Sequence, residues 1–246
     1  MDKALYIAMT GAKHNMMAQA VNANNLANAN TSGFKEDMAV ARSYGVPAEI
    51  AHDSRAYAIT QTPATDFSAG PLMQTGRDLD IATDGDAWLA VLDQDGQEVY
   101  TRSASLMVDA NGQLLTDKGQ PVVGNGGPIA VPPYESILVG VDGSITVRGK
   151  GQGPEVLVTL DRLKLVTPGE GTLVKNSRGD ITLKDGEVAN VDAGARVAAG
   201  FLDGSNVDTI KAMVDMLSLA RQYEAQVKVM QTVGESVDAS TRLMQV

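Results

Sequence analysis

Residues 207–244 read VDTIKAMVDMLSLARQYEAQVKVMQTVGESVDASTRLM, and their apolar side chains recur at alternating steps of three and four residues. This spacing places them on one face of a helix and is the a and d spacing of a coiled coil. A helix of this length extends ~57 Å, which exceeds the width of a small domain. We therefore expect a long C-terminal helix whose apolar seam continues beyond what one domain can cover. The seam consists of Met213, Met216, Ala220, Tyr223, Val227, Met230, Gly234, Val237, Thr241 and Met244.

A shorter seam with the same spacing occupies residues 4–30, near the start of the chain. Two such seams favour an assembly of several chains over an internal helical hairpin, because the middle of the chain is too small to cover both. Small or polar residues interrupt the seams at Gln19, Gly234 and Thr241, which allows further helices to approach closely. The shorter seam consists of Leu5, Met9, Ala12, Met16, Gln19, Ala23 and Leu26.

Asparagines are concentrated at the end of this first helix, in residues 24–35, which read NNLANANTSGFK. Asparagine side chains compete with helical hydrogen bonds and Gly33 permits a positive φ, so we expect the helix to end between Asn28 and Gly33. A simple cap does not explain Asn24, Asn25 and Asn28 inside the last turns, where each lowers helix propensity. These three side chains are expected to form hydrogen bonds with a neighbouring segment.

The middle of the chain changes pattern twice. Residues 34–75 have no sustained period and contain Pro47, Pro63 and Pro71, which predicts an extended strap with at most short strands, lying over the middle domain. Residues 76–200 consist of short apolar runs separated by Asp-Gly and Asn-Gly pairs, the signature of antiparallel hairpins. Strands are predicted at 87–92, 98–102, 106–109, 113–116, 121–123, 137–141, 144–147, 156–166, 172–175 and 181–183.

The predicted fold class is therefore α+β, with an antiparallel all-β central domain flanked by long N- and C-terminal coiled-coil-type helices. The expected divisions are an N-terminal axial helix at 1–33, the strap at 34–75, the β domain at 76–200 and a C-terminal axial helix at 201–246. Ser205 or Asn206 is the predicted N-cap of the last helix, and Asp208 suits the positive end of its dipole.

Composition excludes several classes of function. Twenty Lys and Arg against 30 Asp and Glu give a net charge of -10, which argues against nucleic acid or an anionic membrane as the main partner. The absence of cysteine excludes disulfides, thiolate metal sites and a cysteine nucleophile. Aromatic residues make up only 4%, so an aromatic-lined ligand pocket is not expected. Neither a cleavable signal peptide nor a membrane span is visible, so we expect a soluble chain that would leave the cytoplasm by another route.

Short motifs that resemble enzyme or ligand sites are all weak. Asp93-Gln94-Asp95-Gly96 lacks the distal ligands of a calcium loop and is expected to be a hairpin turn. Residues 149–153 lack the Lys-Ser/Thr ending of a phosphate loop, and Ser32 to Lys35 match a serine acylase in letters only. Arg178-Gly179-Asp180 is interpreted as a turn between strands. We predict no catalytic, cofactor-binding or metal-binding residues, including at His14, His52 and the acidic run Asp78, Asp80, Asp84 and Asp86.

Residues 21–35, VNANNLANANTSGFK, resemble the N-terminal signature of bacterial flagellar rod and hook proteins. The stretches DGDAWLAV at 84–91, YTR at 100–102, DANGQL at 109–114 and GQPVVG at 119–124 resemble the β region of that family. LDGSNV at 202–207, followed by Met213 and by RQYE at 221–224, resembles its C-terminal helix motif. The opening MDKALY and the short overall length are most similar to the proximal rod branch of the family.

The resemblance implies a structural subunit of the flagellar basal body, exported unfolded through the flagellar type III apparatus. Such subunits polymerise into a hollow, periplasm-spanning rod that transmits torque, with terminal helices in an inner coiled-coil layer and the β domain outside. The implied partners are copies of the same chain, proximal and distal rod subunits, and the export apparatus, with no cofactor, nucleic acid or membrane insertion. A distal rod or hook-type role is the nearest alternative; a secreted hydrolase or an adhesin-like fibre is a more distant one. The residues expected to bind partners are Leu5, Met9, Met16, Asn24, Asn25, Leu26, Asn28, Thr31, Gly33, Phe34, Ser205, Asn206, Met213, Met216, Tyr223, Val227 and Met230.

Overall fold

The computed structural model describes residues 2–45, 56–60, 64–151, 156–169 and 171–244. The chain divides into two compact units. The helical unit comprises residues 1–29, 35–67 and 207–246, and the β unit comprises residues 30–34 and 68–206. The chain therefore passes four times from one unit to the other.

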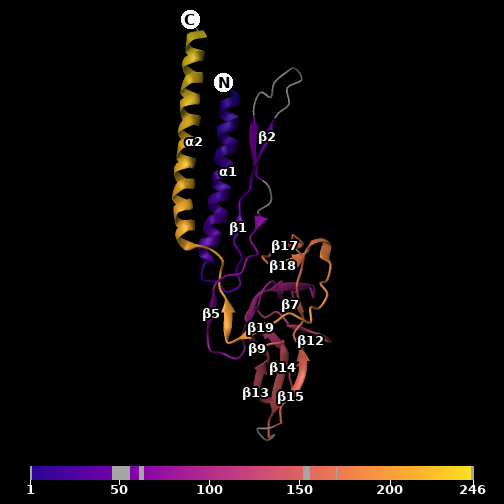
Figure 1. The fold of residues 1–246 in the computed structure, drawn as a ribbon. Helices are drawn as coiled ribbons and strands as arrows, with labels where there is room; N and C mark the ends of the chain where they lie inside the picture. Colours follow the sequence, from indigo (N-terminus) through magenta and orange to yellow (C-terminus); the bar gives the residue numbers. More distant parts are fainter. Residues whose placement is uncertain (1, 46–55, 61–63, 152–155, 170, 245–246) are drawn as a thin grey trace. The chain divides into compact units, whose positions relative to one another are not determined.

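Two long helices dominate the helical unit, as the sequence predicts. Helix α1 (Asp2–Ala27) and helix α2 (Thr209–Met244) run side by side in opposite directions, so that both chain ends lie at the same end of the pair (Figure 1). Asn22 Nδ2, near the end of α1, donates a 2.6 Å hydrogen bond to the carbonyl oxygen of Ala212 in the first turn of α2. Further along, Gly11 lies against the side chain of Gln226. The helices thus pair within the chain, as an internal hairpin would.

The N-cap of α2 differs from the predicted one. Asp208 Oδ1 accepts hydrogen bonds from the backbone amides of Ile210 at 2.9 Å and Lys211 at 3.1 Å, which is the capping arrangement. The backbone amide of Asn206 instead donates to the carbonyl oxygen of Phe34. The prediction of Ser205 or Asn206 was therefore wrong, because the chain stays non-helical for two more residues.

Residues 35–67 group with the terminal helices, whereas the sequence predicted a strap over the middle domain. The backbone forms two short antiparallel pairs, and the second strand of the longer pair packs along α1. The pairs are β1 (Asp37–Met38) with β4 (Ala64–Thr65), and β2 (Ala41–Gly45) with β3 (Ala56–Thr60).

All strand pairs described in the β unit are antiparallel, which confirms the predicted hairpin architecture. The largest sheet has the order β16-β7-β8-β18-β17, the next β10-β9-β6-β19, and a third β13-β14-β15; β11 pairs with β12, and β20 with β5. The strands are β5 (Leu72–Gln74), β6 (Asp80–Thr83), β7 (Trp88–Leu92), β8 (Glu98–Thr101), β9 (Ser103–Val108), β10 (Leu114–Thr116), β11 (Val123–Gly124), β12 (Gly127–Pro128), β13 (Tyr134–Val139), β14 (Ser144–Gly149), β15 (Val158–Arg162), β16 (Leu165–Val166), β17 (Leu173–Lys175), β18 (Ile181–Leu183), β19 (Val197–Ala199) and β20 (Phe201–Asp203), with one 3-10 turn at Lys184–Gly186.

Aspartate side chains fix several hairpin turns of these sheets. Asp93 Oδ1 accepts hydrogen bonds from the amides of Asp95 at 2.8 Å and Gln97 at 2.9 Å, and Gly96 supplies the positive φ of 76°. This geometry confirms the hairpin turn and accounts for the apparent calcium loop. At the turn between β13 and β14, hydrogen bonds from Ser144 hold the pKa of Asp142 below its usual value.

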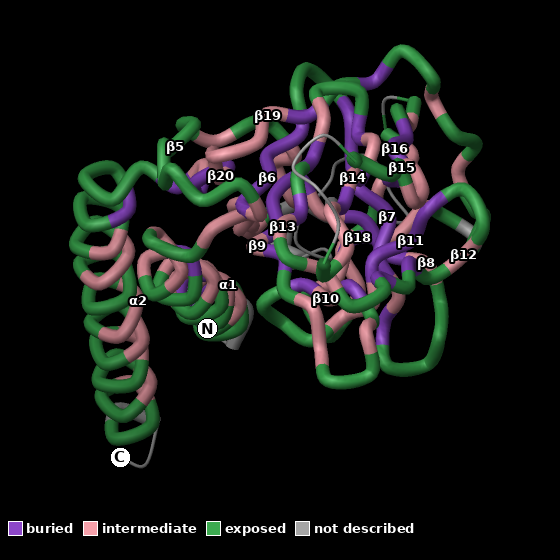
Figure 2. The backbone as a smooth tube through the Cα atoms, turned by 90° about the horizontal axis from the view of Figure 1, so that it is seen from below, coloured by how far each residue is buried: buried purple, intermediate pink, exposed green. Residues whose placement is uncertain are grey.

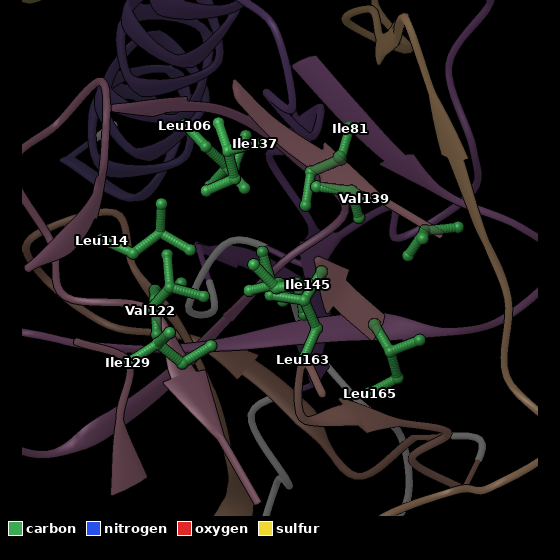
Figure 3. Packing of buried hydrophobic residues seen from close by; sticks show 14 of the residues in the cluster. Ile81, Leu106, Leu114, Val122, Ile129, Ile137, Val139, Ile145, Leu163 and Leu165 are labelled. Carbon is green, nitrogen blue, oxygen red and sulfur yellow. The ribbon is translucent and has the colours of Figure 1, made fainter. Parts of the chain in front are cut away.

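A single apolar core joins the sheets of the β unit (Figure 3). Buried residues are concentrated in this unit, whereas most of α2 is exposed (Figure 2). The core contains Val, Leu, Ile and Ala and no Phe among its buried members, as the scarcity of aromatic residues predicts. Its largest fully buried members include Ile81, Leu89, Leu106, Leu114, Ile145, Leu163 and Leu165.

We expect Leu163→Ala to destabilise the β unit by about 2–5 kcal/mol, because the side chain is fully buried and its removal leaves a cavity. Urea denaturation followed by the fluorescence of Trp88, the single tryptophan, measures this change. Leu138→Ala is the matched control, since that side chain is exposed, and its effect should stay below about 1 kcal/mol. Equal losses in the two variants would contradict the assigned core.

Candidate assembly surface on the terminal helices

The two sides of α1 differ in side-chain size. Buried Ala8, Ala12 and Asn15 lie on the inner side, together with Gly11, where small groups let the neighbouring elements approach closely. The large apolar residues Leu5, Tyr6, Met9, Met16 and Met17 are exposed instead. Close packing therefore selects the small face of α1 and leaves the methionine-rich part of the predicted seam in solvent.

The predicted seam of α2 also divides into two faces. Met216, Val227 and Met230 are half-buried, and Met216 and Met230 each lie one helical turn from residues that contact α1. Met213 is exposed. Around it, the first three turns of α2 carry an apolar stripe formed by Ile210, Met213, Val214 and Leu217, with 64% of Leu217 exposed.

A shallow hollow continues this stripe along α2. Its volume is about 420 Å³, and Val214 and Leu217 form its apolar end while Arg221 and Gln222 form its polar end. Protein interfaces commonly have an apolar centre with an arginine close by. We call the exposed apolar residues of the two helices the assembly surface: Leu5, Tyr6, Met9 and Met16 of α1, and Ile210, Met213, Val214 and Leu217 of α2.

Asn25 serves the internal structure of the chain. Its Nδ2 donates to the carbonyl oxygen of Asp37 at 2.7 Å, and its Oδ1 accepts from the amide of Asp37 at 3.0 Å. The buried amide thus pairs with the backbone of β1 as a neighbouring strand would, and Thr65 Oγ1 donates to Asp37 Oδ1 at 2.7 Å. The hydrogen bond predicted for Asn25 to a neighbouring segment is confirmed.

The other asparagines behave differently. Asn28 Nδ2 donates to the carbonyl oxygen of Asn24 at 2.9 Å, within the same helical end. Asn22, which the sequence reasoning missed, makes the bond to α2 at Ala212. Its position three residues before Asn25, on the same side of α1, is the signal that could have identified it.

The residues predicted to bind partners therefore fall into three classes of exposure. Exposed are Leu5, Met9, Met16, Asn24, Thr31, Met213 and Tyr223; half-buried are Leu26, Asn28, Gly33, Phe34, Asn206, Met216, Val227 and Met230; buried are Asn25 and Ser205.

The motifs that resemble ligand sites have structural partners in the β unit. Arg178 lies in the turn between β17 and β18, where its guanidinium contacts Asp93 at 2.9 Å and Asp95 at 2.7 Å; the bond to Asp95 raises its pKa. Asp180 accepts a bond from Gln120 Nε2 at 3.2 Å. The Arg-Gly-Asp motif therefore joins hairpins of its own unit.

Among the described residues, no three His, Cys, Asp or Glu side chains converge as metal ligands. Asp80, from the acidic run, accepts a bond from Ser105 Oγ at 2.6 Å. His52 and part of the glycine-rich run at 149–153 lie outside the described residues. Within the described residues, neither α1 nor α2 contains an apolar stretch that could cross a membrane.

Comparison with known proteins assigns a family to this arrangement. Three family models match: flagella basal body rod protein at residues 5–35, the flagellar hook protein FlgE/F/G D1 domain at 82–147, and the flagellar basal body rod FlgEFG protein C-terminal region at 198–243. The flagellar basal-body rod protein FlgF of Escherichia coli K12 is 38% identical over 251 residues, which cover 99% of both chains. The chain belongs to the flagellar basal-body rod protein family.

Further relatives cover the chain equally fully. FlgF of Salmonella typhimurium is also 38% identical over 99% of both chains, and the basal-body rod protein FlgG of Bacillus subtilis is 29% identical over 96% of both. The resemblance to the rod family, and to FlgF within it, is thus confirmed. Two of the matching models contain most of α1 and α2, so the family pattern includes the helices that carry the assembly surface.

We expect Asn25→Ala to destabilise the helical unit by about 1–3 kcal/mol, because both backbone groups of Asp37 lose a buried partner. Thermal unfolding by circular dichroism at 222 nm measures the loss, and exchange of the Asp37 amide locates it. Asn24→Ala is the control, since it makes the same change in helix propensity at an exposed position. An equal melting temperature for both variants would contradict the role assigned to Asn25.

Proposed function

We propose that this chain is a structural subunit of the bacterial flagellar basal-body rod, and that the assembly surface joins it to its neighbours. The observation that carries the proposal is the large apolar side chains left exposed on both terminal helices after these helices have paired. Soluble chains rarely leave large groups of apolar side chains uncovered, so these two exposed groups indicate a protein interface.

The energetics favour association. Full burial of one Leu or Met side chain contributes about 1.5–3 kcal/mol, so several such residues on each subunit can offset the loss of translational and rotational freedom on assembly. Under this proposal, α1 and α2 pack against helices of neighbouring subunits in coiled-coil fashion and form a layer of a hollow rod. The seam residues Met216, Val227 and Met230 are already half-buried within the chain, while the exposed stripes supply the contacts to other chains.

The proximal part of the rod is the proposed location. Two relatives named FlgF match at 38% identity over essentially the whole chain, whereas the FlgG of Bacillus subtilis matches at 29%. The proposed partners are copies of the chain, neighbouring proximal and distal rod subunits, and, during passage out of the cell, the flagellar export apparatus. No observation on the described residues favours a hydrolase or an adhesin.

We expect Met16→Asp and Leu217→Asp each to abolish incorporation into rods and motility while the isolated chain keeps its fold. Both side chains are more than 60% exposed, so the carboxylate is solvated in the monomer and becomes costly only when a neighbour covers it. Swimming assays and recovery of the chain in purified basal bodies measure the effect, and circular dichroism reports the monomer fold.

Met16→Leu and Leu217→Met are the matched controls, because they keep the apolar surface, and both should swim normally. Normal incorporation of both aspartate variants would contradict the proposal. A direct contact test is available because the chain contains no cysteine: with a mild oxidant added, Met16→Cys combined with Leu217→Cys should form disulfides between subunits in assembled rods, and the absence of such cross-links would contradict the proposed contacts.

A further inference from the structure

The segments that leave the β unit for the helical unit are hydrogen-bonded to one another inside the β unit. The amide of Asn206 donates to the carbonyl oxygen of Phe34 at 3.4 Å, and Asn206 Nδ2 donates to Ser68 Oγ at 3.3 Å. The amide of Gly33 donates to the carbonyl oxygen of Asp203 at 2.8 Å. Three of the four crossings start from a residue of this network, at Phe34, Ser68 or Asn206, and the fourth enters the five-residue segment 30–34 that contains Gly33.

Backbone lies directly against backbone beside the network. The amide of Gly204 donates to the carbonyl oxygen of Pro71 at 2.9 Å. A Cβ atom added to Gly70 would overlap the carbonyl oxygen of Gly204 and would come within 3.1 Å of Asp203 Oδ1. Residue 70 must therefore be glycine, because the backbone of Gly204 lies too close to leave space for a side chain.

A buried ion pair underlies this contact. Arg102 Nε lies 3.6 Å from Asp203 Oδ2, and the side chains are 5% and 2% exposed. The Arg102 guanidinium also donates to the carbonyl oxygen of Gly85 and lies 5.4 Å from the ring centre of Trp88. These contacts fix Arg102 against the start of β7. The backbone of Asp203 makes two further hydrogen bonds: its carbonyl oxygen accepts from the amide of Gly33, and its amide donates to Ser103 Oγ at 3.0 Å.

Burial of such a pair is not explained by stability alone. Two desolvated charges contribute little net free energy compared with apolar residues of the same shape, although the loss of one partner is strongly destabilising. What the pair provides here is a fixed position for Asp203, the residue that bonds the turn after α1 and precedes the segment leading to α2. A cation–π contact also stabilises the turn after α1, since Lys175 Nζ lies 4.4 Å from the ring centre of Phe34.

We propose that Arg102 and Asp203 are positioning residues of a force-transmitting junction, formed with Gly33, Phe34, Ser68 and Asn206, which fixes all four chain crossings at one place on the β unit. Force applied to one crossing is then shared by the others, because stretching one segment requires breaking bonds to its neighbours. Four separate linkers would instead extend one after another. The force-transmitting role rests on the proposed function as a rod subunit; the mechanical joining of the crossings does not.

Hydrogen exchange of the full-length isolated chain tests the junction. In Arg102→Met we expect the amides of Gly33 and Asn206 to exchange at least tenfold faster, while core amides such as that of Val91 keep their protection. Arg148→Met is the matched control, since Arg148 pairs with Glu135 at 3.5 Å at a partly exposed site of the same unit, and it should change neither junction amide. Unchanged protection of Gly33 and Asn206 in Arg102→Met would overturn the proposal.

A second variant decides the question if Arg102→Met does not fold. Gly70→Ala leaves the ion pair intact but pushes Gly204 away, and it should speed exchange at the same two amides; unchanged exchange would overturn the junction.

For the mechanical role, cells carrying the exchange-sensitive variant should assemble rods and lose swimming speed faster than wild type as medium viscosity rises. Wild-type speed at every viscosity would overturn that role. Because the exchange experiment uses the isolated chain, its outcome is independent of whether the assembly surface joins subunits.

Discussion

Small side chains on one side of α1 set how closely the other elements of the helical unit pack against this helix. Ala8, Ala12 and Asn15 are buried there, and Gly11 lies against the side chain of Gln226. The large apolar residues of α1, such as Leu5, Met9 and Met16, therefore lie on its exposed side. One steric preference thus fixes the internal pairing of the helices and, at the same time, creates the surface that we assign to subunit contacts.

In the β unit, by contrast, the large apolar residues are mostly buried. Its antiparallel sheets close around one aliphatic core, and its turns are held by aspartate side chains such as Asp93. Most of the buried apolar residues of the chain thus belong to the β unit, whereas the terminal helices keep large apolar side chains exposed.

The segments that connect the β unit to the helical unit differ from ordinary linkers. Domain linkers are commonly exposed and make few contacts, whereas the segments at Phe34, Ser68 and Asn206 are bonded to one another and backed by a buried ion pair. Arg102 belongs to the Tyr-Thr-Arg stretch and Asp203 to the Leu-Asp-Gly-Ser-Asn stretch that carried the family resemblance. One of these stretches thus ends where the chain leaves the β unit, and the other supplies the arginine that pairs with it.

Features that depend on near neighbours along the chain could be predicted from local patterns: two long helices from the spacing of apolar residues, hairpins from Asp-Gly and Asn-Gly pairs, and the turn at Gly33 with its φ of 70°. Strands β6 and β19 escaped this reasoning, because Asp80–Thr83 and Val197–Ala199 are short and gain their order from strands distant in sequence. The covered face of α1 and the pairing of Asn25 with Asp37 were settled only by the three-dimensional arrangement of the chain. Each of these depends on which group arrives from elsewhere in the chain, and a local pattern contains no information about that partner.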